Sequence, residues 1–190
     1  MASVLKKRSV AAIITAAVIL ISTLAGVHFS VGRQSRAVER QFYEGVYLES
    51  EGYTQTSIDS QLRQRANAAT GLYSLAIGYL EESETTPLRD AYVALLDEET
   101  ISAKYAADQA LQAAAENVYS LLQTAGMSQR DTDGVEGYIY TLNAARDVIA
   151  RSDYNRVVSD YMSGTLGRFP VNLLRRIALC DYPEYFGTEG

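Results

Sequence analysis

The chain has 190 residues, of which 17 are lysine or arginine and 23 are aspartate or glutamate, and its net charge is −6. All 23 acidic residues but only 14 of the basic ones follow residue 32, so residues 33–190 carry −9. This acidic excess argues against nucleic-acid binding, which needs a basic surface against the phosphates. One cysteine and one histidine exclude an internal disulfide and leave too few ligands for the usual zinc, haem or Cys–His sites.

An uncharged, apolar segment of 24 residues covers residues 9–32 and follows the basic cluster Lys6-Lys7-Arg8. A helix needs roughly 20 apolar residues to cross the ~30 Å hydrocarbon layer of a bilayer. The segment is longer than the roughly 7–15 apolar residues of a signal peptide, and Leu24-Ala25-Gly26 is a poor cleavage site. We therefore predict a basic tail over residues 1–8 and one uncleaved transmembrane helix over residues 9–32.

The charges on either side of this segment set its expected orientation, because cytoplasmic flanks carry an excess of lysine and arginine. The basic residues of the tail are tightly clustered, whereas Arg33, Arg36 and Arg40 are spread along the chain after the segment. We expect a cytoplasmic N-terminus and an external domain. His28, at the far edge of the segment, has no acidic partner within it and is expected to be a neutral imidazole at headgroup depth.

Helical periodicity continues through the rest of the chain. Residues 33–50 meet no helix breaker until Gly45, and a turn is expected near Gly52. Apolar side chains then recur every three or four residues in three longer segments. These segments cover residues 57–83, 87–125 and 128–164, and a short amphipathic piece follows over 171–180.

Capping residues indicate where these helices begin and end. Thr86-Pro87 suits an N-cap and a first helical turn, and Gly126 is a good C-terminal stop. Ser128 with Asp131 three residues on suits the next N-cap. Residues 87–125 would then form one helix of about 58 Å at ~1.5 Å per residue.

No segment shows sustained strand alternation bounded by hairpin turns. We therefore predict an all-α fold, in which a single N-terminal transmembrane helix is followed by an antiparallel bundle of three to four long helices. The bundle is expected to form one domain over residues 33–190.

Two acidic runs, Glu81-Glu82-Ser83-Glu84 and Asp97-Glu98-Glu99, lack the spacing of a calcium-binding loop. We interpret them as solvated helix faces. The sequence also contains no GxSxG, HExxH, CxxC or phosphate-loop pattern. We therefore predict no catalytic residue, no metal ligand and no cofactor.

Short patterns of polar and aromatic residues mark the C-terminal third of the chain. Ala150-Arg151-Ser152-Asp153-Tyr154-Asn155 is followed by Tyr161, by Phe169-Pro170-Val171-Asn172 and by Tyr185-Phe186. These stretches resemble the A-R-x-x-Y-N pattern, the F-P-x-N pattern and the terminal aromatic pair of the LemA family of bacterial membrane-anchored proteins. Upstream, the family's R-x-x-x-x-P-N-L…G-Y region is matched with Thr70-Gly71 in place of Pro-Asn, so the resemblance is to a divergent member. The matching residues are Arg65, Gly78, Tyr79, Arg151, Asp153, Tyr154, Asn155, Tyr161, Phe169, Pro170, Asn172, Tyr185 and Phe186.

We interpret these signature residues as structural. Tyr154-Asn155 is expected to bond a neighbouring helix or the C-terminal loop, because buried polar groups find partners. Arg151 and Asp153 are expected to form an exposed or interhelical ion pair. Phe169-Pro170 is expected to reverse the chain, with Phe169 filling the end of the bundle. Contact of Arg175-Arg176 with lipid headgroups is less favoured, because a lipid-binding cluster usually holds about 4–8 basic residues.

The resemblance implies an N-terminal span followed by a long-helix bundle, and it supplies no reaction. Our leading hypothesis is a non-enzymatic protein of the bacterial cytoplasmic (inner) membrane that binds or positions other envelope proteins or further copies of itself. A first alternative is an extracytoplasmic four-helix bundle that senses a small ligand. A second is a hydrolase or metal enzyme, in which paired acids such as Glu98 and Asp108 would have to act.

Overall fold

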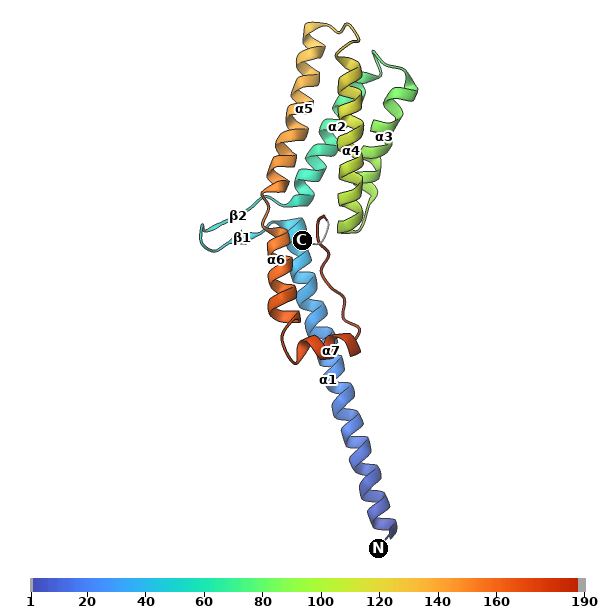
Figure 1. Ribbon diagram of the computed structural model, residues 1–190, viewed down its shortest axis with the longest axis vertical. Coiled ribbons are helices and arrows are strands. Elements are labelled where there is room, and N and C mark those ends of the chain that lie inside the picture. Colours follow the sequence, from blue (N-terminus) through green and yellow to red (C-terminus); the bar gives the residue numbers. More distant parts are fainter. Residues whose placement is uncertain (1, 188–190) are drawn as a thin grey trace. The chain divides into compact units, whose positions relative to one another are not determined.

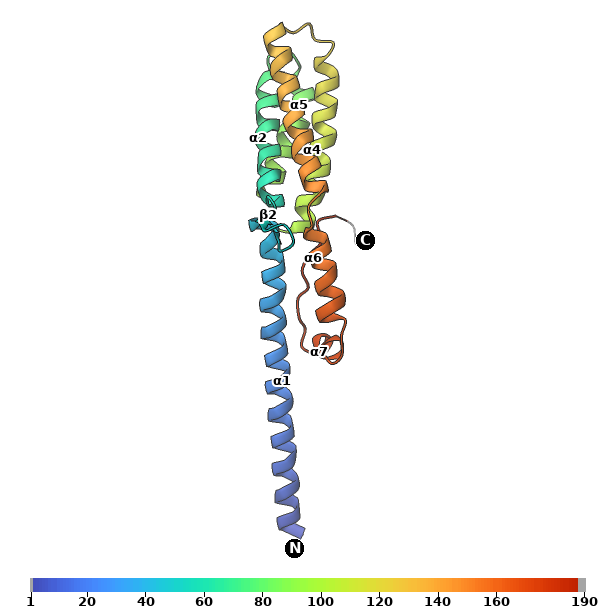
Figure 2. The same ribbon diagram turned by 90° about the vertical axis from the view of Figure 1, so that its left-hand side faces the viewer.

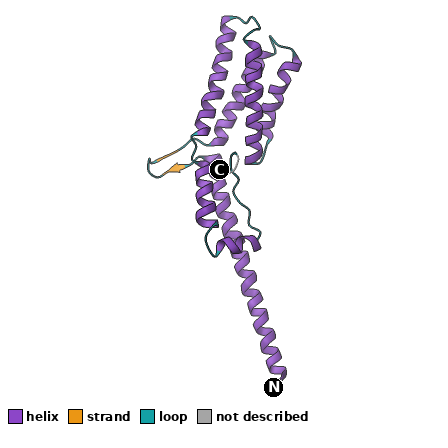
Figure 3. Ribbon diagram, viewed as in Figure 1, coloured by secondary structure: helices purple, strands orange, loops and turns teal. Residues whose placement is uncertain are grey.

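The computed structural model describes residues 2–187, and helices make up most of this range (Figure 1, Figure 3). It confirms the predicted all-α class with one long apolar helix at the N-terminus. In chain order the elements are α1 (Ala2–Glu44), β1 (Tyr47–Leu48), β2 (Tyr53–Thr54), α2 (Ile58–Ala76), α3 (Glu82–Asp97), α4 (Ile101–Leu122), α5 (Gln129–Ala150), α6 (Tyr154–Tyr161), the π-helix η1 (Met162–Leu166) and α7 (Val171–Ile177).

The described chain forms two compact units. The first, which we call the α1 unit, consists of residues 2–39 and 157–183. The second, which we call the bundle unit, consists of residues 40–156 and 184–187. The boundaries between the two units fall within residues 33–190, the range predicted as one domain, and α1 and α6 each supply residues to both units.

Four helices, α2 to α5, form the main part of the bundle unit (Figure 1, Figure 2). Short connections join them, so successive helices run antiparallel, and α2 packs against each of the other three. Burial of each large apolar side chain stabilises such a core by about 1.5–3 kcal/mol. Its fully buried apolar residues include Leu62, Ala66, Ala69, Leu72, Leu88, Leu111, Val118 and Leu122.

The helices α2 and α5 approach closely at Gly71. A Cβ atom placed on Gly71 would lie far inside normal contact distance of Cε1 of Tyr138 on α5. The absence of a side chain at this position therefore makes room for the tyrosine ring.

The helix expected over residues 87–125 is instead a helical hairpin made of α3 and α4. The chain leaves the helix at Glu98, whose backbone is extended (φ −67°, ψ 134°). Thr100 then caps α4, because its Oγ1 accepts a hydrogen bond from the amide of Ala103 at 3.2 Å. Three residues without glycine or proline thus reverse the chain, and the prediction of one continuous helix is wrong.

The start of α3 also differs from the prediction. Glu81 is the N-cap, and the Glu84 carboxylate accepts a hydrogen bond from its amide at 2.9 Å. This capping box starts the helix before Thr86-Pro87, and Pro87 lies inside α3. The acidic run at residues 81–84 therefore has a local structural role in addition to its charge.

The helix expected over residues 128–164 begins as predicted and ends early. Ser128 is the N-cap of α5, and its Oγ accepts a hydrogen bond from the amide of Asp131 at 3.2 Å. Residues 151–153 then leave the helix before α6 begins, and α6 passes into η1. This break separates α5, which belongs to the bundle unit, from α6, most of which belongs to the α1 unit.

A small hairpin follows α1. The helix ends before Gly45, which has φ +96°, a conformation that glycine adopts readily. The strands β1 and β2 pair antiparallel around Gly52, where the turn was predicted. The strands themselves were not predicted, because two residues each are too few to show an alternation.

The α1 unit contains the apolar helix and the C-terminal segment that packs along it. The Tyr161 hydroxyl donates to the carbonyl of Val31 at 3.2 Å, and the Ser35 hydroxyl donates to the carbonyl of Asp181 at 3.0 Å. Among the described residues, α1 is the one helix long and apolar enough to cross a membrane. Its large apolar side chains between Val10 and Leu20 are all at least half exposed.

Phe169 does not fill the end of the bundle. It belongs to the α1 unit, and its side chain is 81% exposed. The chain turns at a cis Phe169-Pro170 peptide and enters α7, so the predicted reversal is present. The break after α5 explains the difference, because it assigns this turn to the other unit.

Candidate functional site: a buried charge network and an exposed hairpin

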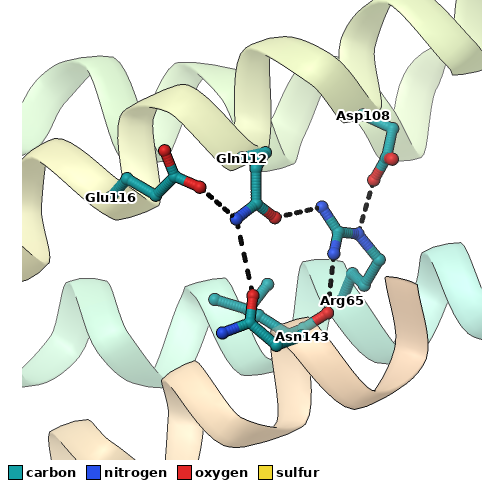
Figure 4. A network of polar contacts seen from close by, with 6 residues as sticks. Arg65, Asp108, Gln112, Glu116 and Asn143 are labelled. Carbon is teal, nitrogen blue, oxygen red and sulfur yellow. Dashed lines mark hydrogen bonds and ion pairs between the residues drawn. The ribbon is translucent and has the colours of Figure 1, made fainter. Parts of the chain in front are cut away.

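Arg65 on α2 connects three helices of the bundle (Figure 4). Its side chain has no exposed surface. The guanidinium donates from Nε to Oδ1 of Asp108 at 2.5 Å and from Nη2 to Oε1 of Gln112 at 2.9 Å, both on α4. It also donates from Nη1 to the carbonyl of Leu142 on α5 at 2.6 Å. One signature residue therefore links α2, α4 and α5 through charge-assisted bonds.

The network continues along α4 through Gln112. Its Nε2 donates to Oε1 of Glu116 at 2.7 Å and to Oδ1 of Asn143 at 3.5 Å (Figure 4). Burial raises the pKa of Asp108, although the neighbouring Arg65 guanidinium opposes this rise. The buried charges compensate one another, as a buried ion pair requires.

A second ionic cluster joins α2 to α4. The Asp59 carboxylate accepts from Nε of Arg63 at 2.8 Å and lies 3.3 Å from Nζ of Lys104. Asp59 and Lys104 are each 7% exposed, whereas the side chain of Arg63 is 66% exposed. Arg63 thus lies at the surface although it is only two residues from Arg65.

A pocket of about 210 Å³ lies beside Asp108 in the bundle unit. Its polar lining includes Gln109 on α4, Arg146 on α5 and Asn155 on α6. Typical small-molecule sites measure about 300–1,000 Å³, so this pocket is small. Glu98 is exposed at the end of α3, whereas Asp108 is buried, so the two acids of the hydrolase alternative lie in different environments.

The A-R-x-x-Y-N residues hold the C-terminal segment. The Tyr154 hydroxyl donates to the carbonyl of Glu184 at 2.7 Å. The Asn155 amide donates to the carbonyl of Phe186 at 2.9 Å and its Oδ1 accepts from the amide of Phe186 at 3.0 Å. The Phe186 ring packs against those of Phe42 and Tyr105. The structure confirms the expected bonds from Tyr154-Asn155 to the C-terminal loop.

Asp153 has a different partner from the one expected. It accepts from Nε of Arg156 at 2.7 Å, whereas Nε of Arg151 donates to the carbonyl of Asp147 at 3.0 Å. Asp153 also exchanges two hydrogen bonds with the side chain of Gln55, each 3.0 Å long. Because Gln55 directly follows β2, these bonds fix the base of the hairpin to the start of α6. The predicted Arg151–Asp153 ion pair is therefore wrong, and Asp153 instead braces the hairpin.

The remaining signature residues have local roles. Gly78 lies in the turn after α2, and the Tyr79 hydroxyl donates to Oδ2 of Asp131. The Ser128 hydroxyl donates to the same oxygen at 2.7 Å, and these two hydrogen bonds hold the pKa of Asp131 below its usual range. Asn172 donates its amide to the carbonyl of residue 168 at 2.9 Å, and Tyr185 is half-buried.

The β1–β2 hairpin projects from the end of the bundle where α2 begins (Figure 1). Tyr47 is 60% exposed and Tyr53 is 49% exposed. A pocket of about 330 Å³ beside the hairpin is lined by Tyr53, Gln55, Val148 and Arg151, among others. Exposed tyrosine and arginine are enriched in protein interfaces. We call Tyr47, Tyr53, Gln55, Val148 and Arg151 together the tyrosine hairpin site. The high tyrosine content was the one feature of the sequence that pointed to it.

No group of three or more histidine, cysteine, aspartate or glutamate side chains among residues 2–187 is arranged to hold a metal ion. No family model matches the chain, and comparisons with curated proteins and with solved structures give no match.

Proposed function

We propose that this protein is a non-enzymatic, LemA-like, single-span protein of the bacterial cytoplasmic membrane whose bundle binds and positions other envelope proteins. The length and apolar surface of α1 support membrane attachment. The mutual bonding of Arg65, Asp108 and Gln112 supports a structural role for the interior polar groups. We further propose a cytoplasmic N-terminus and an external bundle, on the basis of the basic tail.

The tyrosine hairpin site is the observation that carries this proposal. A tyrosine offers a large rigid ring and a hydroxyl at little entropic cost on binding. The two hydrogen bonds between Gln55 and Asp153 fix the base of the hairpin. The hairpin therefore loses less conformational entropy when it binds a partner. Arg151 adds a cation that can pair with a carboxylate on the partner. The site therefore fits a protein surface with apolar groups and an acidic residue.

Site-specific photo-crosslinking in intact membranes tests this proposal. A benzoylphenylalanine is placed at Tyr47 or Tyr53 of the full chain, and at Tyr140 on α5 as control, since Tyr140 is 75% exposed. We expect discrete crosslinked species of the same mass from both hairpin positions and none of that mass from position 140. The additional substitution Gln55→Ala, which removes the brace, should weaken these crosslinks.

Identical crosslink patterns at all three positions would contradict a specific hairpin site. A crosslinked species with twice the mass of the chain would identify a second copy as the partner. No crosslink from either hairpin position, in membranes where the protein is folded, would count against a binding role for this surface.

The pocket beside Asp108 favours ligand sensing as a second candidate function. Its lining brings Gln109, Arg146 and Asn155 together from three helices, and Arg146 could pair with an anionic group. A thermal-shift screen of small anionic metabolites on the full chain tests it. Stabilisation that is lost in Arg146→Ala would support a ligand site, and an unchanged melting temperature across the screen would argue against it.

A further inference from the structure

The segment from Phe169 to Leu179 presents a row of apolar side chains to its surroundings. Phe169, Leu173 and Ile177 follow one another at intervals of four residues and are 81%, 55% and 58% exposed. Leu173 and Ile177 therefore lie on one face of α7, and Phe169 lies in the turn that precedes this helix. Leu179, just after α7, is 80% exposed. The segment therefore has an apolar face that the described chain does not cover.

Hydrogen bonds place this face beside the end of the apolar part of α1. Nδ1 of His28 donates to the carbonyl of Ala178 at 2.9 Å, and the hydroxyl of Ser35 donates to the carbonyl of Asp181. In both views α7 lies beside α1 (Figure 1, Figure 2). Since the uncharged run of the sequence ends at Gly32, the exposed face lies at the level where α1 would leave the hydrocarbon layer.

The residues of the α1 unit that follow the apolar run carry a net positive charge, which an anionic phospholipid surface attracts. Residues 33–39 and 157–183 contain five arginines and three acids, a net charge of +2. Two of these arginines lie in the last turn of α7, at residues 175 and 176. By contrast, residues 40–156 and 184–190 contain nine basic and 20 acidic residues, a net charge of −11. The positive charge is therefore concentrated in the unit that contains the apolar helix.

We propose that residues 169–179 form a membrane-interface element, whose apolar face inserts at the headgroup–acyl boundary while the exposed Arg176 contacts phosphate groups. Arg175 instead lies over the Tyr182 ring, 5.2 Å from its centroid. An amphipathic helix with this division of apolar and basic residues lies in the plane of the interface. The bilayer is the occupant, because the hydrogen bond from His28 to the carbonyl of Ala178 holds the end of this segment beside the apolar part of α1. This inference rests on the proposed membrane anchorage and adds a second point of attachment, which fixes how deep α1 sits.

Single-tryptophan variants of the full chain test the element, because the sequence contains no tryptophan. Leu173→Trp and Ile177→Trp report on the face, Leu20→Trp on the apolar part of α1, and Tyr140→Trp on the bundle. Each variant is reconstituted in phosphatidylcholine–phosphatidylglycerol vesicles with bromine at different depths of the acyl chain. We expect the two α7 variants to show blue-shifted emission that is quenched most by shallow bromines. Leu20→Trp should be quenched most by deep bromines, and Tyr140→Trp by none.

The outcomes separate the element from the anchor. Quenching at position 20 without quenching at positions 173 and 177 overturns the interface element and leaves the anchor intact. A blue shift at 173 and 177 without quenching also overturns it, because protein would then cover the face. Absence of quenching at position 20 overturns the anchorage and, with it, this inference. Circular dichroism of each variant confirms that the helices are retained.

Discussion

Arg65 carries a charge into a position where its side chain has no exposed surface, and Asp108 neutralises it from α4. Removing one partner of a buried pair leaves an uncompensated charge, which typically costs about 3–5 kcal/mol. We therefore expect Arg65→Met to destabilise the protein by this amount. The double variant Arg65→Met/Asp108→Leu should recover most of the loss, because it buries no unpaired charge. Chemical unfolding of the full chain in detergent, followed by circular dichroism, measures both.

Arg63→Met is the matched control for this prediction. Arg63 lies on the same helix and pairs with Asp59, but its side chain is 66% exposed. Exposed pairs contribute about 0–1 kcal/mol, so we expect a loss within this range. Equal losses for the two arginine variants would show that the burial of Arg65 has no energetic consequence.

The contact between Tyr79 and Asp131 predicts a pH dependence of stability. The hydrogen bond lowers the pKa of Asp131, so its contribution is present above the unfolded-state pKa of about 3.9 and is lost as the pH falls through the lowered value. The same bond raises the pKa of Tyr79, so the contribution is present below about 10 and is lost as the pH rises.

The melting temperature of Tyr79→Phe should therefore lie below that of the unmodified protein near neutral pH. The difference should shrink at both acidic and alkaline extremes, because neither protein then has the bond. Tyr140→Phe, at an exposed position, is the control and should show no pH-dependent difference. A constant difference between Tyr79→Phe and the unmodified protein at every pH would contradict this assignment.

The partners of Arg65 could not be predicted from the sequence, although the residue itself could. Its bond to Asp108 spans 43 residues and depends on the reversal between α3 and α4. In one continuous helix over residues 87–125, the chain would not reverse between residues 88 and 108. The position of Asp108 beside α2 therefore could not be deduced from the predicted helix. Long-range pairs require the correct placement of every intervening turn, whereas the local bonds at Ser128 follow from spacing alone.

At the scale of the elements, Gly71 and Gly137 form an informative pair. Alanine at Gly71 would place a Cβ against the Tyr138 ring, and overpacking typically costs about 1–3 kcal/mol. Gly137 in α5 has nothing within 4 Å of such a Cβ atom. Replacement of a helical glycine by alanine gains up to about 1 kcal/mol of helix propensity.

We therefore expect Gly137→Ala to stabilise the protein and Gly71→Ala to be less stable than Gly137→Ala by about 1–3 kcal/mol. Unfolding curves of the two variants measure the difference directly. The double variant Gly71→Ala/Tyr138→Ala should remove the clash, so that alanine at position 71 contributes its higher helix propensity to stability. This gain is reduced by the packing energy lost with the Tyr138 ring. Equal stabilisation by the two single substitutions would mean that α2 and α5 do not approach closely at Gly71.

Periodicity predicted that helices exist, and caps decided where they end. The stripes over 57–83 and 128–164 predicted the existence and the starts of α2 and α5, because one buried face forces a repeat of 3.6 residues. Both helices end earlier than predicted, at Ala76 and Ala150. The turn at residues 98–100 was missed because neither glycine nor proline marks it. Phe169 was misplaced for a related reason, since a strongly apolar residue was assigned to the nearest core. In the structure it is exposed, which suits a lipid neighbour.

At the scale of the whole molecule, charge differs strongly between the parts of the chain. The tail before the apolar run contains three basic residues and no acid, whereas residues 40–156 and 184–190 carry −11. Membrane insertion responds to the basic residues close in sequence to the span. The arginines of α7 lie more than 130 residues beyond it, so the folded arrangement does not change the expected orientation.

The orientation itself is the last prediction. We expect an enzyme reporter that is active only outside the cytoplasm to give a signal when it follows residue 190. A fluorescent reporter that matures only in the cytoplasm should give none at the same position. Replacing Lys6, Lys7 and Arg8 by glutamine should weaken this preference, because the charge bias before the span is then removed.

The opposite pair of signals would place the bundle in the cytoplasm and overturn the orientation inferred from charge. The partners of the tyrosine hairpin site would then be cytoplasmic proteins drawn to the membrane rather than envelope proteins. The interface element would be unaffected, because His28 fixes α7 to the same end of the span on either side. Under the proposed anchorage, topology therefore decides which proteins can meet Tyr47 and Tyr53, whereas the proposed depth of α1 in the bilayer depends on the α1 unit alone.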